Sequence, residues 1–302
     1  VELDNDMYEN GVWKPGKVPI AVIMISLNEG HNLNDVCENL SGWAHEVFLV
    51  DSYSKDETID IALNYGIRVV QRRFRGFGDQ WNFALNELDI KSPWVMKLDP
   101  DERLTDELKI NISNVISENQ YDAFSLKRRL WFMGKSLSIH QKLIRVWRPG
   151  VCRFSDVDVN EHPIIDGNVG HVKGDLEHRD SPNLDHWLEK QNRYSTLEAE
   201  IAYKNKPLSD EQIFFGTSLQ RRMWLKRNFY KVPFRYFFLF VYHYLFQGAI
   251  RSGRVGYIWA RLRLEVMRLV EYKQFEMKIL NKTPTKRFYG PGKPDNRVKN
   301  FN

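Results

Sequence analysis

Cysteine is scarce in this 302-residue chain, which holds only Cys37 and Cys152, far apart in the sequence. Two distant cysteines form neither a disulfide framework nor a C-x-x-C metal site. The sequence therefore predicts a protein of a reducing compartment, in which thiols stay reduced.

Long hydrophobic runs are also missing. The first six residues, Val1–Asp6, are acidic and lack an apolar core, so we expect no signal peptide. The aromatic run Val232–Phe246 has 15 residues and is interrupted by Arg235 and His243, whereas a membrane-spanning helix needs about 20. We therefore expect no segment that crosses a membrane.

Two phosphate-binding motifs are absent as well. No G-x-G-x-x-G follows the first predicted strand, and G-x-x-x-x-G-K-[ST] occurs nowhere in the chain. These absences argue against a dinucleotide-dependent enzyme and against a P-loop NTPase.

Charge is distributed unevenly, although the net charge is only +5. Residues 221–302 carry 19 Lys and Arg against 4 Asp and Glu, whereas residues 1–220 carry 25 against 35. A basic C-terminal region on an acidic body predicts an anionic partner, either a membrane or a nucleic acid.

The chain does contain a regular alternation of predicted strands and helices. Its 42% hydrophobic and 27% charged residues are typical of globular domains. The alternation predicts βαβ units in an α/β fold with a mostly parallel sheet, followed after Asn183 by helical, aromatic and basic sequence. The predicted strands are 19–27, 47–50, 67–71, 94–98, 123–130 and 143–147, and the predicted helices are 32–40, 54–65, 80–88 and 184–201.

Three of these strands end in polar or acidic segments, namely Ser26–Glu29, Asp51–Thr58 and the tetrad Asp99–Glu102. Open α/β sheets bind ligands at the carboxyl ends of their strands, so we expect the three segments to surround one ligand. Side chains of the first two segments can bind a base or a ribose, and the tetrad suits Mg²⁺ or Mn²⁺ on a diphosphate. The alternative for the tetrad is the acidic first turn of a helix.

In these segments the chain resembles family 2 of the inverting glycosyltransferases, whose GT-A fold is a Rossmann-like, mostly parallel sheet flanked by helices. The resemblance covers about residues 19–201 and implies a nucleotide-sugar donor, with UDP favoured by family frequency, and a Mn²⁺ or Mg²⁺ ion. The residues that it places at the nucleotide or donor are Ser26, Asn28, Glu29, Asp51, Ser52, Arg75, Gly78, Gln80, Asn82 and Asp99. The residues that it places at the metal are Asp101, Asp99 and His178. For His178, a bond to a phosphate or a structural role remains open.

Within the family, the similarity is to bacterial lipopolysaccharide-core and capsule transferases. It implies Glu161 as the general base that accepts the proton of the acceptor hydroxyl, with Asp156 and Asp158 as alternatives. The acceptor would be a bacterial surface glycan or a lipid-linked molecule. Candidates for acceptor contact are Arg128, Arg129 and Trp131, with solvated arginines and a core tryptophan as the alternatives.

The predicted organisation is a GT-A catalytic domain over residues 1–205 and a helical, basic region over 206–302. The catalytic domain would divide into a nucleotide-binding half, 17–103, and an acceptor half, 104–205. We expect the aromatic, basic region to contact an anionic membrane peripherally, at the cytoplasmic face of the inner membrane. Packing of its aromatic side chains on the protein or on a second subunit is the alternative, and the oligomeric state is not predicted.

Two other functions compete with this interpretation. A sugar nucleotidyltransferase usually carries a glycine-rich loop with basic residues after the first strand, and residues 28–32 contain no Lys or Arg. A nucleic-acid-binding protein would use the basic, aromatic region, but it leaves the acidic strand ends without a role. Both are disfavoured, and we expect no nucleic-acid partner.

Overall fold

The computed structural model describes the greater part of the chain. The described residues are 12–155, 162–204, 213, 215–216, 220–221, 224, 228–229, 232–283, 289–290 and 293–294. The chain forms two compact units, the first within Val1–Leu130 and His140–Arg179, the second within Trp131–Ile139 and Asp180–Asn302. The domain boundary expected at residue 205 stays a prediction, because that residue lies outside the described ones.

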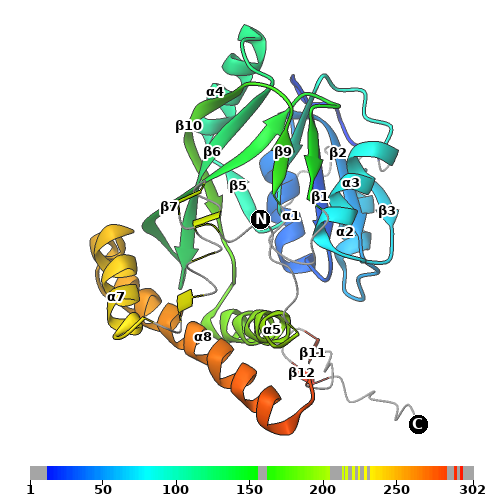
Figure 1. Ribbon diagram of the computed structural model, residues 1–302. Helices are drawn as coiled ribbons and strands as arrows, with labels where there is room; N and C mark the ends of the chain where they lie inside the picture. The colour runs from blue at the N-terminus through cyan, green and yellow to red at the C-terminus, as the bar shows by residue number, and fades with distance from the viewer. Residues whose placement is uncertain are drawn as a thin grey trace, which may run out of the picture. The chain divides into compact units, whose positions relative to one another are not determined.

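The helices and strands alternate through the first unit and give way to helices in the second (Figure 1). From the N-terminus they are β1 (Val18–Ser26), α1 (Gly30–Leu40), β2 (Ala44–Asp51), α2 (Thr58–Asn64), β3 (Arg68–Gln71), α3 (Phe77–Glu87), β4 (Trp94–Lys97), β5 (Glu102–Leu104), α4 (Asp106–Glu118), β6 (Ala123–Phe132), β7 (Lys135–Trp147), β8 (Cys152–Phe154), β9 (Pro163–Ile165) and β10 (Val169–His178). The later ones are α5 (Leu184–Tyr203), α7 (Arg235–Val241), the π-helix η3 (Tyr242–Phe246), the 3₁₀-helix η4 (Ala249–Ser252), α8 (Gly253–Leu280), β11 (Tyr289–Gly290) and β12 (Lys293–Pro294).

An eight-stranded sheet organises the fold, in the order β3-β2-β1-β4-β7-β6-β10-β5. The parallel pairs are β1 with β2, β1 with β4, β2 with β3, and β6 with β10. β4 pairs antiparallel with β7, and β5 pairs antiparallel with β10. The mostly parallel α/β sheet that the sequence predicts is therefore confirmed.

Alternate side chains of β1 belong to two separate hydrophobic clusters. Val22 and Met24 pack with side chains of α1, α2 and α4. Ala21 and Ile23 pack with Trp81 of α3 and with side chains of β2 and β8. Helices therefore cover both faces of the sheet, and β1 is buried on both sides, as is usual for a central parallel strand. The polar side chain of β1 is Ser26, the last residue of the strand.

α2 begins at Thr58, four residues later than the sequence predicts. The backbone N–H and the hydroxyl of Ser54 both donate to the carboxylate of Asp51. Asp56 Oδ1 accepts from the Thr58 N–H at 3.2 Å. Bonds to these side chains replace the first helical turn, because Ser and Asp offer the backbone local partners outside a helix. Residues 52–57 consequently form a loop.

The acidic tetrad does not begin a helix, so that alternative is wrong. Glu102 is the first residue of β5, and α4 starts only after Thr105, whose side chain accepts from the Leu108 N–H. β7 is also much longer than the predicted strand 143–147. It is joined to β6 by Met133 and Gly134, both at positive φ (51° and 70°), as a tight two-residue hairpin turn requires.

Helices α5 and α8 are joined by polar bonds within the second unit. α5 starts at the cap Asn183, whose side chain accepts from the His186 N–H at 2.9 Å. Lys273 of α8 donates to the backbone oxygen of Asn192 and to the hydroxyls of Ser195 and Thr196, each at 2.8 Å. One ammonium thus links three residues of the predicted helix 184–201 to the last long helix.

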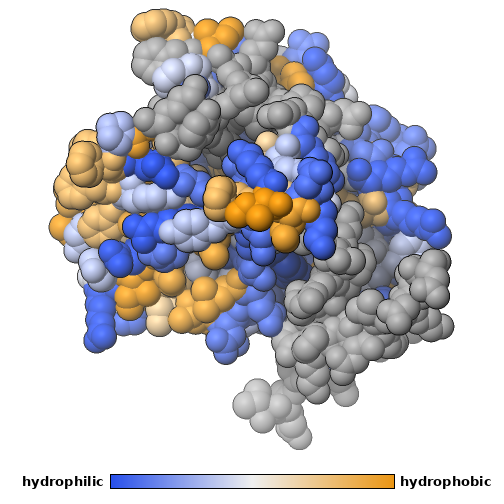
Figure 2. Space-filling model, turned by 60° about the horizontal axis from the view of Figure 1, so that its bottom comes forward, coloured by the Kyte–Doolittle hydropathy of each residue, from blue (hydrophilic) through white to orange (hydrophobic). Residues whose placement is uncertain are grey.

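Hydrophobic side chains gather on the surface where α7 lies, on the left of Figure 2. Even so, none of the helices in the described part of the chain combines the length and hydrophobicity that crossing a bilayer requires.

Candidate functional site

The buried carboxylate of Asp51 joins the ends of β1 and β2. Ser26 and Asp51 are partners in the parallel register, and the Ser26 hydroxyl donates to Asp51 Oδ1 at 2.8 Å. Asp51 Oδ2 accepts from the Ser54 N–H at 2.8 Å and from Gln71 Nε2 at 3.3 Å. A carboxylate with this many donors is held in one orientation. Its anchoring fixes the loop that follows β2.

A second set of bonds ties the loop after β1 to the loop after β2. Asn28, at φ 58°, donates its N–H to Ser54 Oγ at 2.8 Å, and its side-chain oxygen accepts from the Lys55 N–H at 2.8 Å. The Gly30 N–H, in the first turn of α1, donates to Asp56 Oδ2 at 3.0 Å. The predicted donor residues Ser26, Asn28 and Asp51 are therefore brought together in one connected cluster.

Glu29 lies in the same cluster, at the start of α1. Its N–H donates to Thr58 Oγ1 at 2.9 Å, and its carboxylate accepts from Asn32 Nδ2 at 2.9 Å. A Cβ added at Gly30 would lie 3.1 Å from Asp56 Oδ2. The close approach explains why the smallest residue follows Glu29.

Gln80 of α3 connects the loop after β2 with Arg72. Its Nε2 donates to Ser52 Oγ at 3.4 Å, and its Oε1 accepts from Arg72 Nη1 at 2.9 Å. Arg72 is also paired with Asp79. The bond to Asp79 raises the pKa of the guanidinium, and burial, which lowers that pKa, offsets only part of the rise. Ser52 and Gln80 are thus brought together as the sequence predicts. Arg75 is exposed and Gly78 is buried in the first turn of α3.

Asn82 has a different environment from the other predicted donor residues. Its Nδ2 donates to the backbone oxygen of Phe154 at 3.0 Å, and its Oδ1 accepts from the Phe154 N–H at 2.8 Å. The whole amide therefore holds the end of β8. The predicted base Glu161 and the alternatives Asp156 and Asp158 follow shortly after β8, and they lie outside the described residues.

The acidic tetrad carries a buried network of opposite charges. Arg145 Nη2 lies 2.6 Å from Glu102 Oε1 and 2.9 Å from Asp99 Oδ2. Arg128 Nη1 lies 3.3 Å from the same oxygen of Glu102. Glu102 is fully buried and Arg145 is nearly so. Charges removed from water to this extent need partners, and each of these charges has one.

Opposing influences set the pKa of Asp99. Burial alone raises it, but the Arg145 guanidinium, and after it the Lys97 ammonium, outweigh burial and hold the pKa below its usual range. Lys97 is itself buried, with its Nζ 4.3 Å from the centre of the Trp81 ring. Asp99 is therefore an ionised carboxylate with one oxygen on Arg145.

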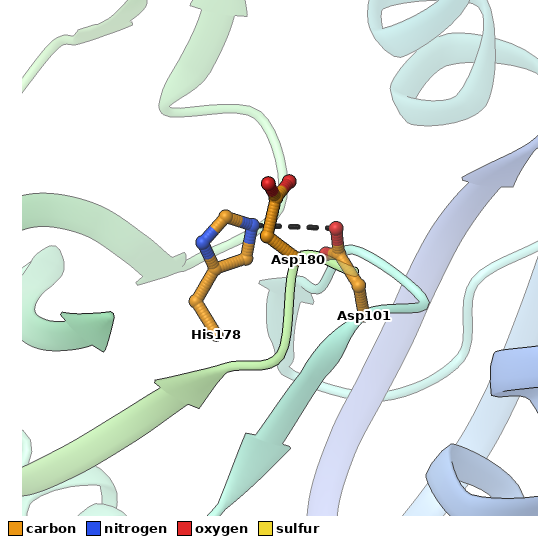
Figure 3. Close-up of side chains that lie close together, drawn as sticks. All are labelled: Asp101, His178 and Asp180. Carbon is orange, nitrogen blue, oxygen red and sulfur yellow. Dashed lines mark ion pairs between the residues drawn. The ribbon is translucent and has the colours of Figure 1, made fainter. Parts of the chain in front are cut away.

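Asp101 and His178 form the part of the site that fits a metal ion. His178 Nε2 lies 3.3 Å from Asp101 Oδ2, and β10 brings His178 opposite Glu102 in the β5 register. Asp180 follows His178 by two residues, at the point where the second unit begins, and its side chain is drawn beside them (Figure 3). The three residues each offer a ligand atom, and these atoms lie within 4.8 Å of one another.

This donor set fits Mn²⁺ or Mg²⁺. Two carboxylate oxygens are the ligands that both ions prefer, and an imidazole nitrogen adds a ligand that first-row transition ions accept. The third ligand atom of this group comes from Asp180, whose Oδ1 also lies 2.6 Å from Lys190 Nζ. The metal role predicted for Asp99, whose Oδ2 is bonded to Arg145, stays a prediction. In the sequence, Asp180 could have been recognised as a carboxylate two residues after the predicted ligand His178.

The three predicted acceptor residues, Arg128, Arg129 and Trp131, all lie on β6, and their contact with an acceptor stays a prediction. Arg128 pairs with buried Glu102 and also donates to Gln141. Arg129 lies 3.7 Å from Asp175 of β10, and Trp131 belongs to the second unit. Arg145 was missed in the sequence, although a charged residue within the apolar run 143–147 predicts a buried partner.

The protein-family model described as "Glycosyl transferase family 2" matches residues 21–174. The chain belongs to glycosyltransferase family 2. The matched residues run from β1 into β10 and include Asp51, Asp99 and Asp101. Membership confirms the predicted enzyme class, so neither the nucleotidyltransferase nor the nucleic-acid-binding alternative is retained.

This glycosyltransferase has relatives of similar length. It is 28% identical over 256 residues to "Lipopolysaccharide core biosynthesis glycosyltransferase LpsC" of Rhizobium meliloti (strain 1021), covering 81% of this chain and 87% of that one. It is 23% identical over 279 residues to an uncharacterized glycosyltransferase of Rickettsia typhi, covering 87% and 89%. The predicted similarity to lipopolysaccharide-core transferases is confirmed at this level.

Solved structures similar to this glycosyltransferase are distant. S. aureus TarS 1-349 covers 87% of this chain and 92% of its own, with a TM-score of 0.43 and 13% identity. Glucosyl-3-phosphoglycerate synthase from Mycobacterium tuberculosis, solved with Mn²⁺, uridine-diphosphate and glucosyl-3-phosphoglycerate, covers 38% and 50%, with a TM-score of 0.30 and 20% identity.

Proposed function

We propose that this glycosyltransferase moves a sugar, with inversion, from a nucleotide-diphosphate sugar to a hydroxyl of a bacterial surface glycan or lipid-linked acceptor. The observation that carries the proposal is the pair of clusters at the strand ends, one centred on Asp51 and one on Asp101 and His178. The similarity to a lipopolysaccharide-core transferase supports the lipopolysaccharide core as the acceptor class.

The Asp51 cluster would bind the nucleotide. Anchored carboxylate and amide groups of Asp51, Asn28 and Glu29 are suited to the N–H groups of a base and the hydroxyls of a ribose. Their mutual bonds hold the loops in place before the ligand arrives. A preformed site spends less binding free energy on ordering its loops. UDP is the first candidate among the nucleotides.

Asp101, His178 and Asp180 would hold the Mn²⁺ or Mg²⁺ ion beside the diphosphate. When bound, such an ion stabilises the negative charge that develops on the leaving diphosphate. Asp99, kept ionised by Arg145, would remain free to accept a hydrogen bond from the donor through its second oxygen.

Glu161 would act as the base on the acceptor side, with Asp156 or Asp158 as the alternatives. The carboxylate takes the proton of the acceptor hydroxyl while that oxygen forms its bond to the anomeric carbon. The bond from the anomeric carbon to the diphosphate oxygen breaks at the same time, and the nucleoside diphosphate leaves. Attack opposite the leaving group inverts the anomeric configuration.

We further propose that the enzyme works at the cytoplasmic face of the inner membrane, in peripheral contact with anionic lipid. The basic composition of residues 221–302 supports this location. A lipid-linked acceptor would be presented at the same surface.

Calorimetric titration with UDP, GDP and dTDP, each with and without Mn²⁺, tests the donor site. We expect one nucleotide to bind tightly only with Mn²⁺, and Asp101→Ala to abolish that requirement together with most of the affinity. Asp89→Ala, which removes an exposed carboxylate paired with Lys91, is the control and should bind like the parent. Binding that ignores both Mn²⁺ and Asp101 would refute the metal-dependent reaction.

A further inference from the structure

The segment from Phe234 to Phe246 presents an apolar stripe to its surroundings. The exposed side chains recur at helical spacing through α7 and η3, and this outer stripe consists of Phe234, Phe237, Phe238, Tyr242, Leu245 and Phe246. Phe234 is 81% exposed, and Phe246 is 79% exposed. A surface helix normally turns its apolar stripe toward the core. The outer stripe is turned the other way.

The inner face of the same segment is fixed on α8. Arg235 donates to both carboxylate oxygens of Glu271, at 3.0 and 2.6 Å. The His243 ring meets the Trp259 ring edge-on, with centroids 5.3 Å apart. Burial raises the pKa of Tyr236, on this inner face, to about 12. These contacts set the rotation of the segment about its axis, so the packing itself exposes the outer stripe.

The sequence around the outer stripe contains no acidic residue. Residues 212–264 include no Asp or Glu, and their ten basic residues are Arg221, Arg222, Lys226, Arg227, Lys231, Arg235, Arg251, Arg254, Arg261 and Arg263. Arg251 directly follows the exposed Ile250, Arg254 lies in the first turn of α8, and both arginines are exposed. Apolar and cationic residues therefore occur together in this stretch of sequence, and the carboxylate of Glu271 on α8, which contacts the segment, is paired with Arg235.

From this arrangement we infer that the outer stripe docks on the surface of an anionic phospholipid bilayer. The aromatic rings enter the boundary between headgroups and acyl chains, where amphipathic aromatic helices bind. Exposed arginines meet the lipid phosphates, each contributing about a fivefold gain in partitioning, the equivalent of ~1 kcal/mol. The membrane contact, which the sequence predicts only for a basic, aromatic region, is thereby assigned to specific residues.

The charge pattern favours a bilayer over a second copy of the chain. A two-fold dimer brings the same patch of both copies together, so the exposed Arg251 and Arg254 would then approach the same arginines of the second copy. An anionic bilayer supplies the opposite charge to both arginines.

Co-sedimentation of the chain with lipid vesicles, in the absence of nucleotide and acceptor, tests this docking surface. We expect binding to phosphatidylglycerol/phosphatidylcholine vesicles and little binding to pure phosphatidylcholine. Phe237→Ser/Phe238→Ser should lower the bound fraction at least tenfold. The matched control is Tyr272→Ser/Phe275→Ser on α8, which changes side chains that are 63% and 65% exposed, close to the 63% and 56% of Phe237 and Phe238, and it should bind within twofold of the parent.

Charge is tested separately with Arg251→Gln/Arg254→Gln, which should weaken binding to anionic vesicles about fivefold per residue. Phe246→Ser, at the end of the outer stripe, provides a second reading if the double serine variant folds poorly. Equal binding of the stripe and control variants, or equal binding to anionic and neutral vesicles, would overturn the inference. Sedimentation velocity provides a further test. A dimer that dissociates only in the stripe variants, while their vesicle binding stays unchanged, would also overturn the inference. Because no donor is present, these results do not depend on the proposed reaction.

Discussion

Arg145 and Glu102 form a buried ion pair, with Arg145 Nη2 2.6 Å from Glu102 Oε1. The same nitrogen reaches Asp99, so one guanidinium joins the start of β5 to the loop that follows β4. Burial lowers the pKa of Arg145, but Glu102 and then Asp99 outweigh it and raise that pKa above its usual value. The guanidinium therefore stays charged, and its partners stay in place around the predicted donor site.

Removing Arg145 is expected to destabilise the fold strongly. Arg145→Met leaves the fully buried Glu102 with the longer contact to Arg128 and the bond from the Asp99 N–H, and breaking a buried pair in this way costs about 3–5 kcal/mol. Urea unfolding followed by circular dichroism measures the change. Lys91→Met, which breaks the exposed pair with Asp89, is the control and should cost less than about 1 kcal/mol. A loss of equal size in both variants would show that the network contributes little.

A second carboxylate makes stability depend on pH. Glu46 is buried and accepts from the N–H of Ser92, from its hydroxyl and from the Lys91 N–H. Burial raises the pKa of Glu46, but the bonds from Ser92, and after them the bond from Arg68, hold it below its usual range. A depressed folded pKa means that the stabilisation is present above the unfolded pKa of about 4.3. It is lost as the pH falls through the folded value.

Glu46→Gln should therefore lower the free energy of unfolding at pH 7 and reduce the loss of stability on acidification below about pH 4.3. Urea midpoints between pH 3 and pH 7 measure both effects. Glu87→Gln, on the exposed side of α3, serves as the control and should leave the pH profile unchanged. An unchanged profile for Glu46→Gln would assign the acid sensitivity to other carboxylates.

The sequence predicted what depends on local pattern and strand order. Buried β-branched runs identified β1 and β2, and because parallel neighbours end at the same edge, Ser26 and Asp51 were expected together. The first eight residues of β7 follow a hairpin turn at Met133 and Gly134 that no apolar run predicts. The partners of Arg145, Asp99 and Glu102, are distant from it in the sequence, so the strand pattern did not identify them. Asp180 becomes a candidate ligand only because the antiparallel pairing of β10 with β5 brings His178 beside Asp101.

Asn82 gives a prediction that separates a donor-binding role from a positioning role. Both ends of its amide bond the backbone of Phe154, which precedes the segment containing Glu161. We expect Asn82→Ala to lower kcat at least tenfold while the dissociation constant for the nucleotide stays within twofold. Asn86→Ala, an exposed amide on the same helix, should change neither. A tenfold loss of nucleotide affinity with unchanged kcat would instead place Asn82 at the donor.

The metal-binding residues can be distinguished by comparing Asp180 with Asp99. Both carboxylates have a cationic partner, since Asp180 Oδ1 lies 2.6 Å from Lys190 Nζ and Asp99 Oδ2 is bonded to Arg145. Asp180, however, belongs to the group of ligand atoms within 4.8 Å of one another. We expect Asp101→Asn and Asp180→Asn each to weaken Mn²⁺ binding at least tenfold. Asp99→Asn should weaken it less than threefold but should still lower nucleotide affinity.

Electron paramagnetic resonance of free Mn²⁺ in a titration without nucleotide reports metal affinity directly. Glu177→Gln, which removes a neighbouring carboxylate paired with Arg179, is the control. An Asp99→Asn variant that loses Mn²⁺ while Asp180→Asn retains it would restore the metal set predicted from the sequence.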